Sequence, residues 1–272
     1  MNDTPDFATV TQVQQQTWSE GDFAMVAGLV NRDADNLAEA LEIFPGEKVL
    51  DVACGSGNAA IAAARRAWGN TTGADFVPAL LERARERAAA ERLDVEFVEA
   101  DAQDLPFGDA GFDVTMSIFG VMFAPDQQKA ADELLRVTKP GGRIGLASWC
   151  PDGGLEKLFL AIFKHTGGPP PGVMPPVLWG TEEHLRNLFG EGISELRARR
   201  LKSRQPFFSV DQYLDFFRTY FGPIKTAYEK VGPEGEQALT EDLRAMLAEA
   251  NTAGDRALVL EPEYLQAIAV RR

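Results

Sequence analysis

The sequence predicts an α/β fold: a doubly wound, mainly parallel sheet of seven strands, covered by helices and completed by a helical cap. Two observations carry this prediction. Short apolar runs alternate with helical patterns from about residue 46 to residue 150, as in strand–helix–strand units with right-handed crossovers. Beyond residue 150 the alternation gives way to proline-rich and aromatic helical stretches, which indicate a cap.

The N-terminal segment, residues 1–45, has helical rather than strand patterns. Polar residues fill 11–16. Leu37, Leu41 and Phe44 recur at helical spacing until Pro45 and Gly46 end the pattern. We therefore expect helices before the first strand.

The central segment, residues 46–150, is expected to form the core of the sheet. Pro78 suits the first turn of a helix, and Pro140-Gly141-Gly142 ends another. The predicted strands are 48–53, 71–74, 95–98, 112–118 and 143–149, and the predicted helices are 59–68, 78–92 and 127–138.

The C-terminal segment, residues 151–272, is expected to supply the remaining strands and a helical cap. A helical stretch leads into residues 167–176, where proline and glycine exclude a regular element. Thr181 is placed to cap the next helix. The expected helices are 155–164, 213–221 and 234–250, and the expected strands are 194–204 and 264–270.

Composition argues against membrane, secreted and metal-dependent classes. No apolar run approaches the roughly 20 residues of a membrane span. The N-terminus lacks the basic start and apolar stretch of a signal sequence. Cys54 and Cys150 have no ligand-like spacing, so we expect neither a disulfide framework nor a metal site, and a cytoplasmic location.

The net charge of −14 argues against a nucleic-acid partner, because such proteins carry a basic face for phosphates. The densest basic cluster, within 197–204, alternates with apolar residues and is interpreted as the solvated side of a strand. We expect a small-molecule partner, no membrane partner, and a monomer or homodimer.

The most informative motif follows the first predicted core strand. Gly55 and Gly57 allow a tight turn, and the helix that they open offers free backbone N–H groups to a nucleotide-like ligand. A plain tight turn is the alternative, since Gly-x-Gly alone is a weak signal. Asp51, inside the strand, is a carboxylate suited to a ligand that carries an ammonium group.

Three further strand ends offer polar groups to the same edge of the sheet, where ligands of open α/β sheets bind. Asp75 ends the second strand and can accept hydrogen bonds from ribose hydroxyls, and Phe76 can cover an adenine face. Asp101-Ala102 follow the third strand, where they can accept from the adenine amine, and Ser117 ends the fourth.

Taken together, these motifs resemble the class I S-adenosylmethionine-dependent methyltransferases, especially the branch similar to ubiquinone/menaquinone-biosynthesis enzymes. The resemblance covers roughly residues 35–150 and implies a Rossmann-like fold with an antiparallel last strand, S-adenosylmethionine as the cofactor, and methyl transfer as the activity. The matching segments are 49–58, 73–75, 99–107, 112–125 and 135–143.

The resemblance also implies roles for single residues. Asp51 would help to hold the methionine amino group, and Gly55 and Gly57 would line the methionine and ribose portions. The family usually has glycine at the position of Ala53, where alanine is still small.

The same resemblance implies that Asp75 binds the ribose and that Asp101 and Ala102 contact the adenine. The stretch 18–23 resembles family members whose N-terminal helix folds over the cofactor, which makes residues 1–45 a candidate lid. Trp18 and Phe23 are then either lid residues or simple packing residues.

No catalytic residue stands out. His165 and Asp126 are weak candidates, since a histidine here more often packs or lies at the surface and Asp126 is placed to cap a helix. His184 is weaker still. The aromatic stripe of 213–221 suits either core packing or a cap over the methyl acceptor.

Two alternatives to methyl transfer stay open from the sequence. A nicotinamide-dependent oxidoreductase would need the glycine turn without Asp51 and a proton donor such as a Tyr–Lys pair, and neither is apparent. A protein that binds S-adenosylmethionine but uses it structurally, or for a cyclisation, is compatible with the same motifs.

The Asn/Asp-Pro-Pro-aromatic motif of amino methyltransferases for adenine is replaced by Ser117-Ile118-Phe119-Gly120, which argues against a DNA methyltransferase.

Overall fold

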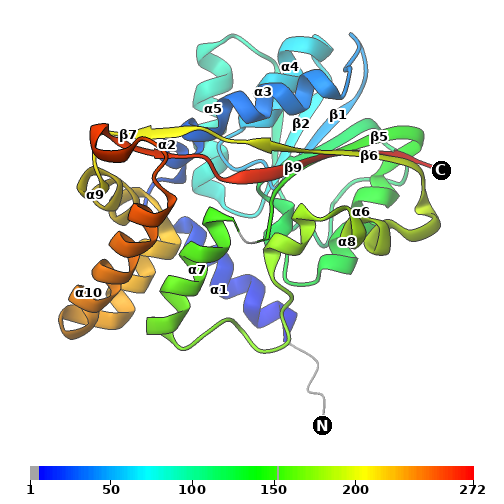
Figure 1. Ribbon diagram of the computed structural model, residues 1–272. Helices are drawn as coiled ribbons and strands as arrows, with labels where there is room; N and C mark the ends of the chain where they lie inside the picture. The colour runs from blue at the N-terminus through cyan, green and yellow to red at the C-terminus, as the bar shows by residue number, and fades with distance from the viewer. Residues whose placement is uncertain (1–5, 152) are drawn as a thin grey trace.

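The computed structural model describes residues 6–151 and 153–272. Residues 1–5, which entered the argument against a signal sequence and belong to the expected lid segment, lie outside the described residues. Figure 1 shows a twisted central sheet with helices on both faces and a separate group of helices beside one end of it. Within the described ranges, no helix is long and apolar enough to cross a membrane.

The central sheet has seven strands in the order β3-β2-β1-β4-β5-β9-β6. The strands from β3 to β5 pair in parallel, whereas β9 is antiparallel to both β5 and β6. The predicted mainly parallel sheet with an antiparallel last strand is confirmed. The strands are β1 Val49–Val52, β2 Thr71–Asp75, β3 Val95–Glu99, β4 Phe112–Ile118, β5 Thr138–Trp149, β6 Ile193–Lys202 and β9 Glu263–Arg271.

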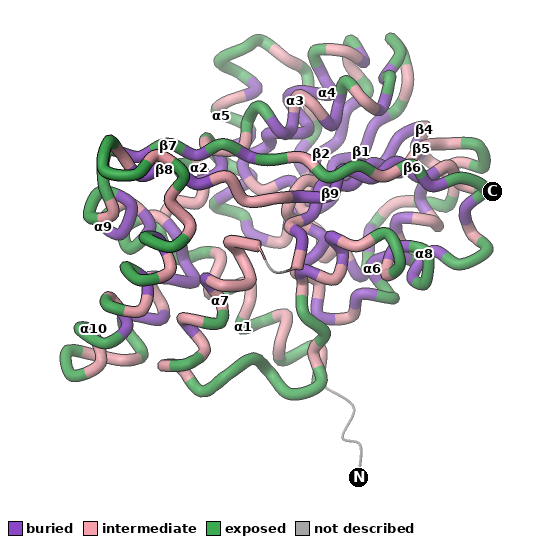
Figure 2. The backbone as a smooth tube through the Cα atoms, viewed as in Figure 1, coloured by how far each residue is buried: buried purple, intermediate pink, exposed green. Residues whose placement is uncertain are grey.

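Five helices cover the two faces of the sheet. Helices α3 (Asn31–Ala40), α4 (Asn58–Ala67) and α5 (Pro78–Ala90) lie on one face. Helices α6 (Gln127–Val137) and α8 (Glu182–Phe189) lie on the other. Figure 2 shows the central strands buried between these layers, as expected for parallel strands that are covered on both faces.

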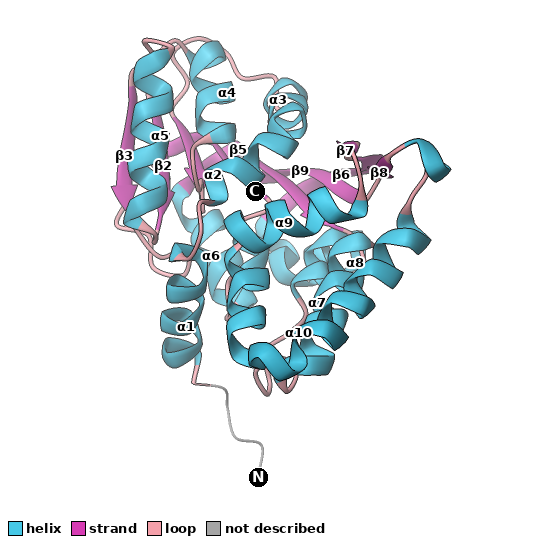
Figure 3. Ribbon diagram, turned by 90° about the vertical axis from the view of Figure 1, so that its left-hand side faces the viewer, coloured by secondary structure: helices cyan, strands magenta, loops and turns pink. Residues whose placement is uncertain are grey.

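The remaining helices form a cap with its own apolar core (Figure 3). Helix α10 is kinked at Gly232, where φ is 62°, directly before Pro233. Proline lacks the N–H of the helical ladder, so a break at this point is expected. The cap helices are α1 Phe7–Ser19, α2 Phe23–Ala27, α7 Gly154–Thr166, α9 Val210–Tyr220 and α10 Gly222–Ala250.

The structure differs from the sequence prediction in four places. Helix α3, assigned to the lid segment, packs on the sheet beside α4. The first half of α10, α2 and a small sheet of β7 (Gln205–Phe207) and β8 (Leu258–Leu260) were not predicted. These elements are short or carry weak periodicity, and contacts within the cap stabilise them.

Candidate active site

The tight turn between β1 and α4 holds Ala53, Gly55 and Gly57 in left-handed conformations, with φ angles of 53°, 54° and 83°. Glycine adopts this conformation freely, whereas alanine does so only at a cost. Ala53 also lies against Gly120, where an added Cβ would sit 2.4 Å from the Ala53 carbonyl oxygen. The N-cap residue of α4, Gly57, has no side chain to cap the helix. Asp51 accepts from the Ala60 N–H, and the N–H groups of the first two helical residues are available to a ligand.

Asp51 is fully buried behind this turn. Its Oδ2 accepts a hydrogen bond from the Ala60 backbone N–H (2.7 Å), and its Oδ1 has no partner among the described residues. Burial raises the pKa of Asp51 to about 8, with a further contribution from the negative charge of Asp75. A buried carboxyl with an unpaired oxygen is stabilised in its charged form by a nearby cation.

Asp75, at the end of β2, joins that strand to the turn. Its Oδ2 accepts a hydrogen bond from the Gly55 N–H (2.7 Å) and its Oδ1 from the Val77 N–H (2.9 Å). Burial raises the pKa of Asp75 to about 6, although these hydrogen bonds lower it. Each carboxylate oxygen has room for a second donor, so the side chain can also bind a ligand.

Asp101 follows β3 and is held by Gln103, whose side-chain amide lies 3.0 Å from both carboxylate oxygens. The Gln103 amide also donates to the Thr11 hydroxyl (3.2 Å), and its carbonyl oxygen accepts from the Asp126 N–H (2.9 Å). One buried glutamine therefore connects helix α1, the end of β3 and the start of α6.

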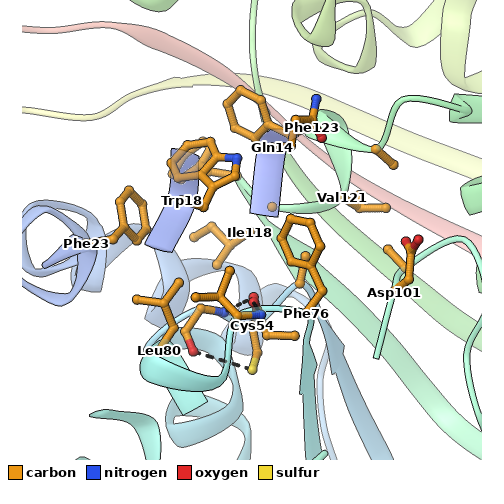
Figure 4. Close-up of a pocket in the computed structure, with 18 of the residues that line it drawn as sticks. Gln14, Trp18, Phe23, Cys54, Phe76, Leu80, Asp101, Ile118, Val121 and Phe123 are labelled. Atoms are coloured by element: carbon orange, nitrogen blue, oxygen red, sulfur yellow. Dashed lines mark hydrogen bonds between the residues drawn. The ribbon is translucent and has the colours of Figure 1, made fainter. Parts of the chain in front are cut away.

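These strand ends and the N-terminal helices enclose one cavity, called here the first cavity (Figure 4). Phe76 and Asp101 project into it from the strand ends, and Trp18 and Phe23 from the N-terminal helices. The predicted site residues that line it are Trp18, Phe23, Ala53, Gly55, Asp75, Phe76, Asp101 and Ala102.

Helices α1 and α2 cover the first cavity and are held by contacts with both the core and the cap. On the core side, the Gln15 side chain donates a hydrogen bond to the Phe76 carbonyl. On the cap side, the Asp22 N–H donates to the Tyr220 carbonyl (3.2 Å). Gly222 packs so closely that an added Cβ would lie 1.9 Å from the Thr17 carbonyl oxygen.

Three predicted site residues do not line the first cavity. The Ser117 hydroxyl donates to the Val52 carbonyl (2.6 Å) and accepts from the Val121 N–H (3.0 Å). This corrects the expectation for Ser117, because its polar group is used to hold β4 against β1. Gly57 faces Ala84 and Phe97 instead of the first cavity. Asp51 is buried behind the glycine turn and does not belong to the cavity wall.

The structure does not bring the weak catalytic candidates to the cavity. His165 on α7 bonds to Asp242 on α10 (Nε2–Oδ2 2.6 Å), which ties two cap helices together. Asp126 caps α6 by accepting from the Lys129 N–H (3.1 Å). His184 contacts Gln127 (2.7 Å), and burial lowers its pKa.

A second cavity of about 420 Å³ lies between the cap and the open end of the sheet. Its wall is mainly apolar, and three members of the aromatic stripe, Tyr213, Phe217 and Phe221, contribute to it. These side chains also pack in the cap core, which confirms the packing interpretation of the stripe, whereas its role as a cap over the methyl acceptor stays a prediction. Five residues line both cavities: Trp18, Phe23, Val30, Phe119 and Phe123.

Sequence reasoning did not identify several residues at the first cavity. Gln103 follows Asp101 within a matching segment, but its partners lie on distant elements and give no local signal. Asn58 anchors the turn to α2 through a hydrogen bond to the Ala27 carbonyl (2.7 Å). Phe119 has a positive φ of 51° and stacks on Trp149, with ring centroids 3.8 Å apart, which places it between the two cavities.

Comparisons with known proteins agree with this geometry. A family model described as a methyltransferase domain matches residues 49–142. An uncharacterized protein of Mycobacterium tuberculosis is 37% identical over 99% of both chains. A demethylmenaquinone methyltransferase of Thermus thermophilus is 44% identical over 41% of this chain and 51% of its own length.

A solved structure, the YcgJ protein of Bacillus subtilis, has the same fold, with a TM-score of 0.62 and 18% identity over 89% of this chain and 99% of that one. The family match covers the strand ends and the glycine turn that build the first cavity. The chain therefore belongs to the class I S-adenosylmethionine-dependent methyltransferases, in the branch similar to the ubiquinone/menaquinone-biosynthesis enzymes.

Proposed function

We propose that this enzyme transfers a methyl group to an oxygen, nitrogen or carbon nucleophile of a small, mainly apolar molecule that binds in the second cavity. The observation that carries the proposal is the shared wall of the two cavities, which places an apolar chamber directly beside the site suited to the cofactor. A volume of about 420 Å³ lies within the range of small-molecule sites.

The first cavity fits S-adenosylmethionine by its donor set. Asp75 would bind the ribose through its carboxylate, Asp101 and Ala102 would contact the adenine edge, and Phe76 would cover the ring, since all four residues line the cavity. The unpaired Oδ1 of Asp51 lies on a buried carboxyl behind the turn, and a cationic ligand nearby would favour the charged form of that carboxyl. When bound, the cofactor supplies a methyl group activated on a positively charged sulfonium.

The protein's own contribution to the reaction is then positioning and exclusion of water. Neither His165 nor Asp126 lines either cavity, so no role as a general base is assigned to them. An activated methyl group does not require one when the nucleophile is held in line. Trp18 and Phe23 cover the junction of the cavities and keep it dry.

The test incubates the full-length protein with methyl-labelled S-adenosylmethionine and a panel of apolar phenols, amines and enols, and measures S-adenosylhomocysteine. We expect label in at least one acceptor. Phe217→Trp, which fills the second cavity, should lower turnover of bulky acceptors and leave cofactor affinity unchanged. Phe216→Trp, on the same helix but outside the cavity wall, is the matched control. Cofactor binding without product from any acceptor would contradict the proposal.

A further inference from the structure

Tyr213 is a polar residue fixed in the apolar wall of the second cavity. It lies in the first turn of α9 and is only 4% exposed. Its ring stacks on Phe217 with centroids 4.1 Å apart and meets the edge of Phe207 at 5.0 Å. These contacts on both sides hold the phenol in one orientation.

The Tyr213 hydroxyl makes no hydrogen bond within the described part of the chain, and burial alone raises the pKa of the phenol. It therefore stays protonated, as a donor, at neutral pH. By contrast, the hydroxyl of Tyr228 in the same cap pairs with Thr240 (2.9 Å). Tyr213 lines the second cavity, so a ligand there can pair with its hydroxyl, which an apolar ligand would leave unpaired at a cost.

Gln205 supplies a second polar side chain to the same cavity. It is 9% exposed, and its side-chain amide makes no hydrogen bond to any residue in the ranges 6–151 and 153–272. Gln205 and Phe207 are both buried and lie two positions apart on β7, so their side chains share a face of that strand. Because Phe207 contacts Tyr213, the two polar groups belong to one region of the wall.

The charged residues of the cavity already have opposite charges near them. Arg200 lies 3.7 Å from Glu263, Lys202 lies 3.8 Å from Glu261, and Lys157 lies 2.7 Å from Glu249. Tyr213 and Gln205 share the cavity wall with apolar side chains such as Leu158, Leu247 and Leu260. A neutral oxygen suits this position better than an ionised group, since an unpaired charge would be desolvated there.

We propose that Tyr213 and Gln205 form a recognition pair that binds a neutral oxygen, a carbonyl or hydroxyl, of an otherwise apolar acceptor. This inference rests on the proposed function, in that the second cavity holds the acceptor. The phenol donates to the oxygen, and the amide both donates and accepts. The pair positions the acceptor and selects for it, because a molecule without the oxygen leaves both groups unpaired.

The test compares two probes of nearly equal shape, 1-acetylnaphthalene and 1-ethylnaphthalene, on the full-length protein loaded with S-adenosylhomocysteine. Binding is followed by calorimetry. We expect the acetyl probe to bind about 10-fold more tightly to the unmodified protein, the scale of one net hydrogen bond. Tyr213→Phe and Gln205→Leu should each reduce that ratio, and the double variant should remove it.

The control is Tyr228→Phe, which removes a paired hydroxyl from the same cap outside the cavity wall and should leave the ratio unchanged. Tyr213→Phe should not lower the melting temperature, because its hydroxyl has no protein partner. A ratio near one in the unmodified protein, a ratio retained in the double variant, or no binding of either probe would overturn the inference.

Cofactor affinity, measured in parallel, separates this inference from the proposed function. Tyr213 and Gln205 lie outside the first cavity wall, so their variants should bind S-adenosylmethionine normally. Failure of the unmodified protein to bind the cofactor would count against the proposed function itself. Equal binding of the two probes by the unmodified protein, with intact cofactor binding, would count against the recognition pair only.

Discussion

At the scale of single residues, the first cavity depends on two buried carboxyl groups that serve the protein and the ligand together. Asp75 bonds to the backbone of the glycine turn, and Asp51 bonds to the first turn of α4. Both are held in surroundings that disfavour charge, with pKa values raised to about 6 and about 8. A cationic ligand that enters this region offsets that penalty.

Replacing Asp75 with alanine should weaken S-adenosylmethionine binding by about 1–3 kcal/mol, the scale for losing a buried polar partner. Calorimetry at pH 7.5 measures the change. Asp94→Ala, an exposed acid at the opposite edge of the sheet, should leave the affinity unchanged. Equal affinities for Asp75→Ala and the unmodified protein would show that the ribose lies elsewhere.

Cofactor binding should release a proton from Asp51. With a pKa of about 8, this carboxyl is mostly protonated at pH 7, and a nearby cationic ligand favours its charged form. Affinity should therefore rise as the pH increases from 6.5 to 8.5. Calorimetry in buffers of different ionisation enthalpy measures the released proton, and Asp51→Asn should remove it. A release that persists in Asp51→Asn would assign the proton to another group.

Asp51 also affects the stability of the ligand-free protein. Its folded pKa lies above the usual value of 3.8, so between those values the folded state binds more protons than the unfolded state. The contribution of this group to stability is thus complete below about pH 4 and is lost as the pH rises through about 8. The contribution of Asp51 to the stability of the ligand-free protein therefore falls as the pH rises, whereas cofactor affinity is expected to rise.

At the scale of elements, the junction of α9 and α10 supports the N-terminal helices over the first cavity. Tight backbone contact at Gly222 and the ion pair between Lys225 and Glu20 hold α1 and its following turn in place. The N-terminal helices are thus held by this junction, so changes at Gly222 or Lys225 are expected to reach the first cavity.

Gly222→Ala should weaken cofactor binding, although Gly222 lines neither cavity. The added methyl group would overlap the Thr17 carbonyl oxygen and push α1 away from the cap. We expect a loss of about 10-fold in affinity, the effect of disturbing an ordered cover. Gly28→Ala, with no atom within 4 Å of the added Cβ, is the control. If both variants bind alike, the cap does not position the lid.

The strand ends could be predicted from sequence because their signals are local. Asp75 and Asp101 end apolar runs, and the glycine turn follows another, so parallel topology alone brings them to one edge. Gln103 could not be predicted, since its role depends on Thr11 and Asp126 in distant elements. For Ser117, the sequence shows its position at the strand end but not that backbone groups occupy its hydroxyl.

At the scale of the whole molecule, the first cavity is built by the core of the sheet together with the helices that precede it in sequence. The strands of residues 49–118 supply the floor of the first cavity, and α1 and α2 supply its cover. Binding should therefore stabilise the fold as a unit, because a ligand that binds only the folded state adds its binding free energy.

Saturating S-adenosylmethionine, at about 100 times its Kd, should add about 2.7 kcal/mol and raise the melting temperature by roughly 5–10 °C. Differential scanning fluorimetry measures the shift. Deleting residues 1–30 should remove most of it, as should the milder pair Trp18→Ala and Phe23→Ala, which keeps the helices. An undiminished shift in both variants would show that these residues only pack and do not act as a lid.

The side chains common to both cavities link the binding of one ligand to the binding of the other. Trp18, Phe23, Val30, Phe119 and Phe123 face the two chambers at once, so each occupant helps to set the shape that the other meets. Such linkage is reciprocal in binding free energy. A molecule that fills one cavity should therefore change the affinity of the other cavity for its own ligand, and the factor is the same in both directions.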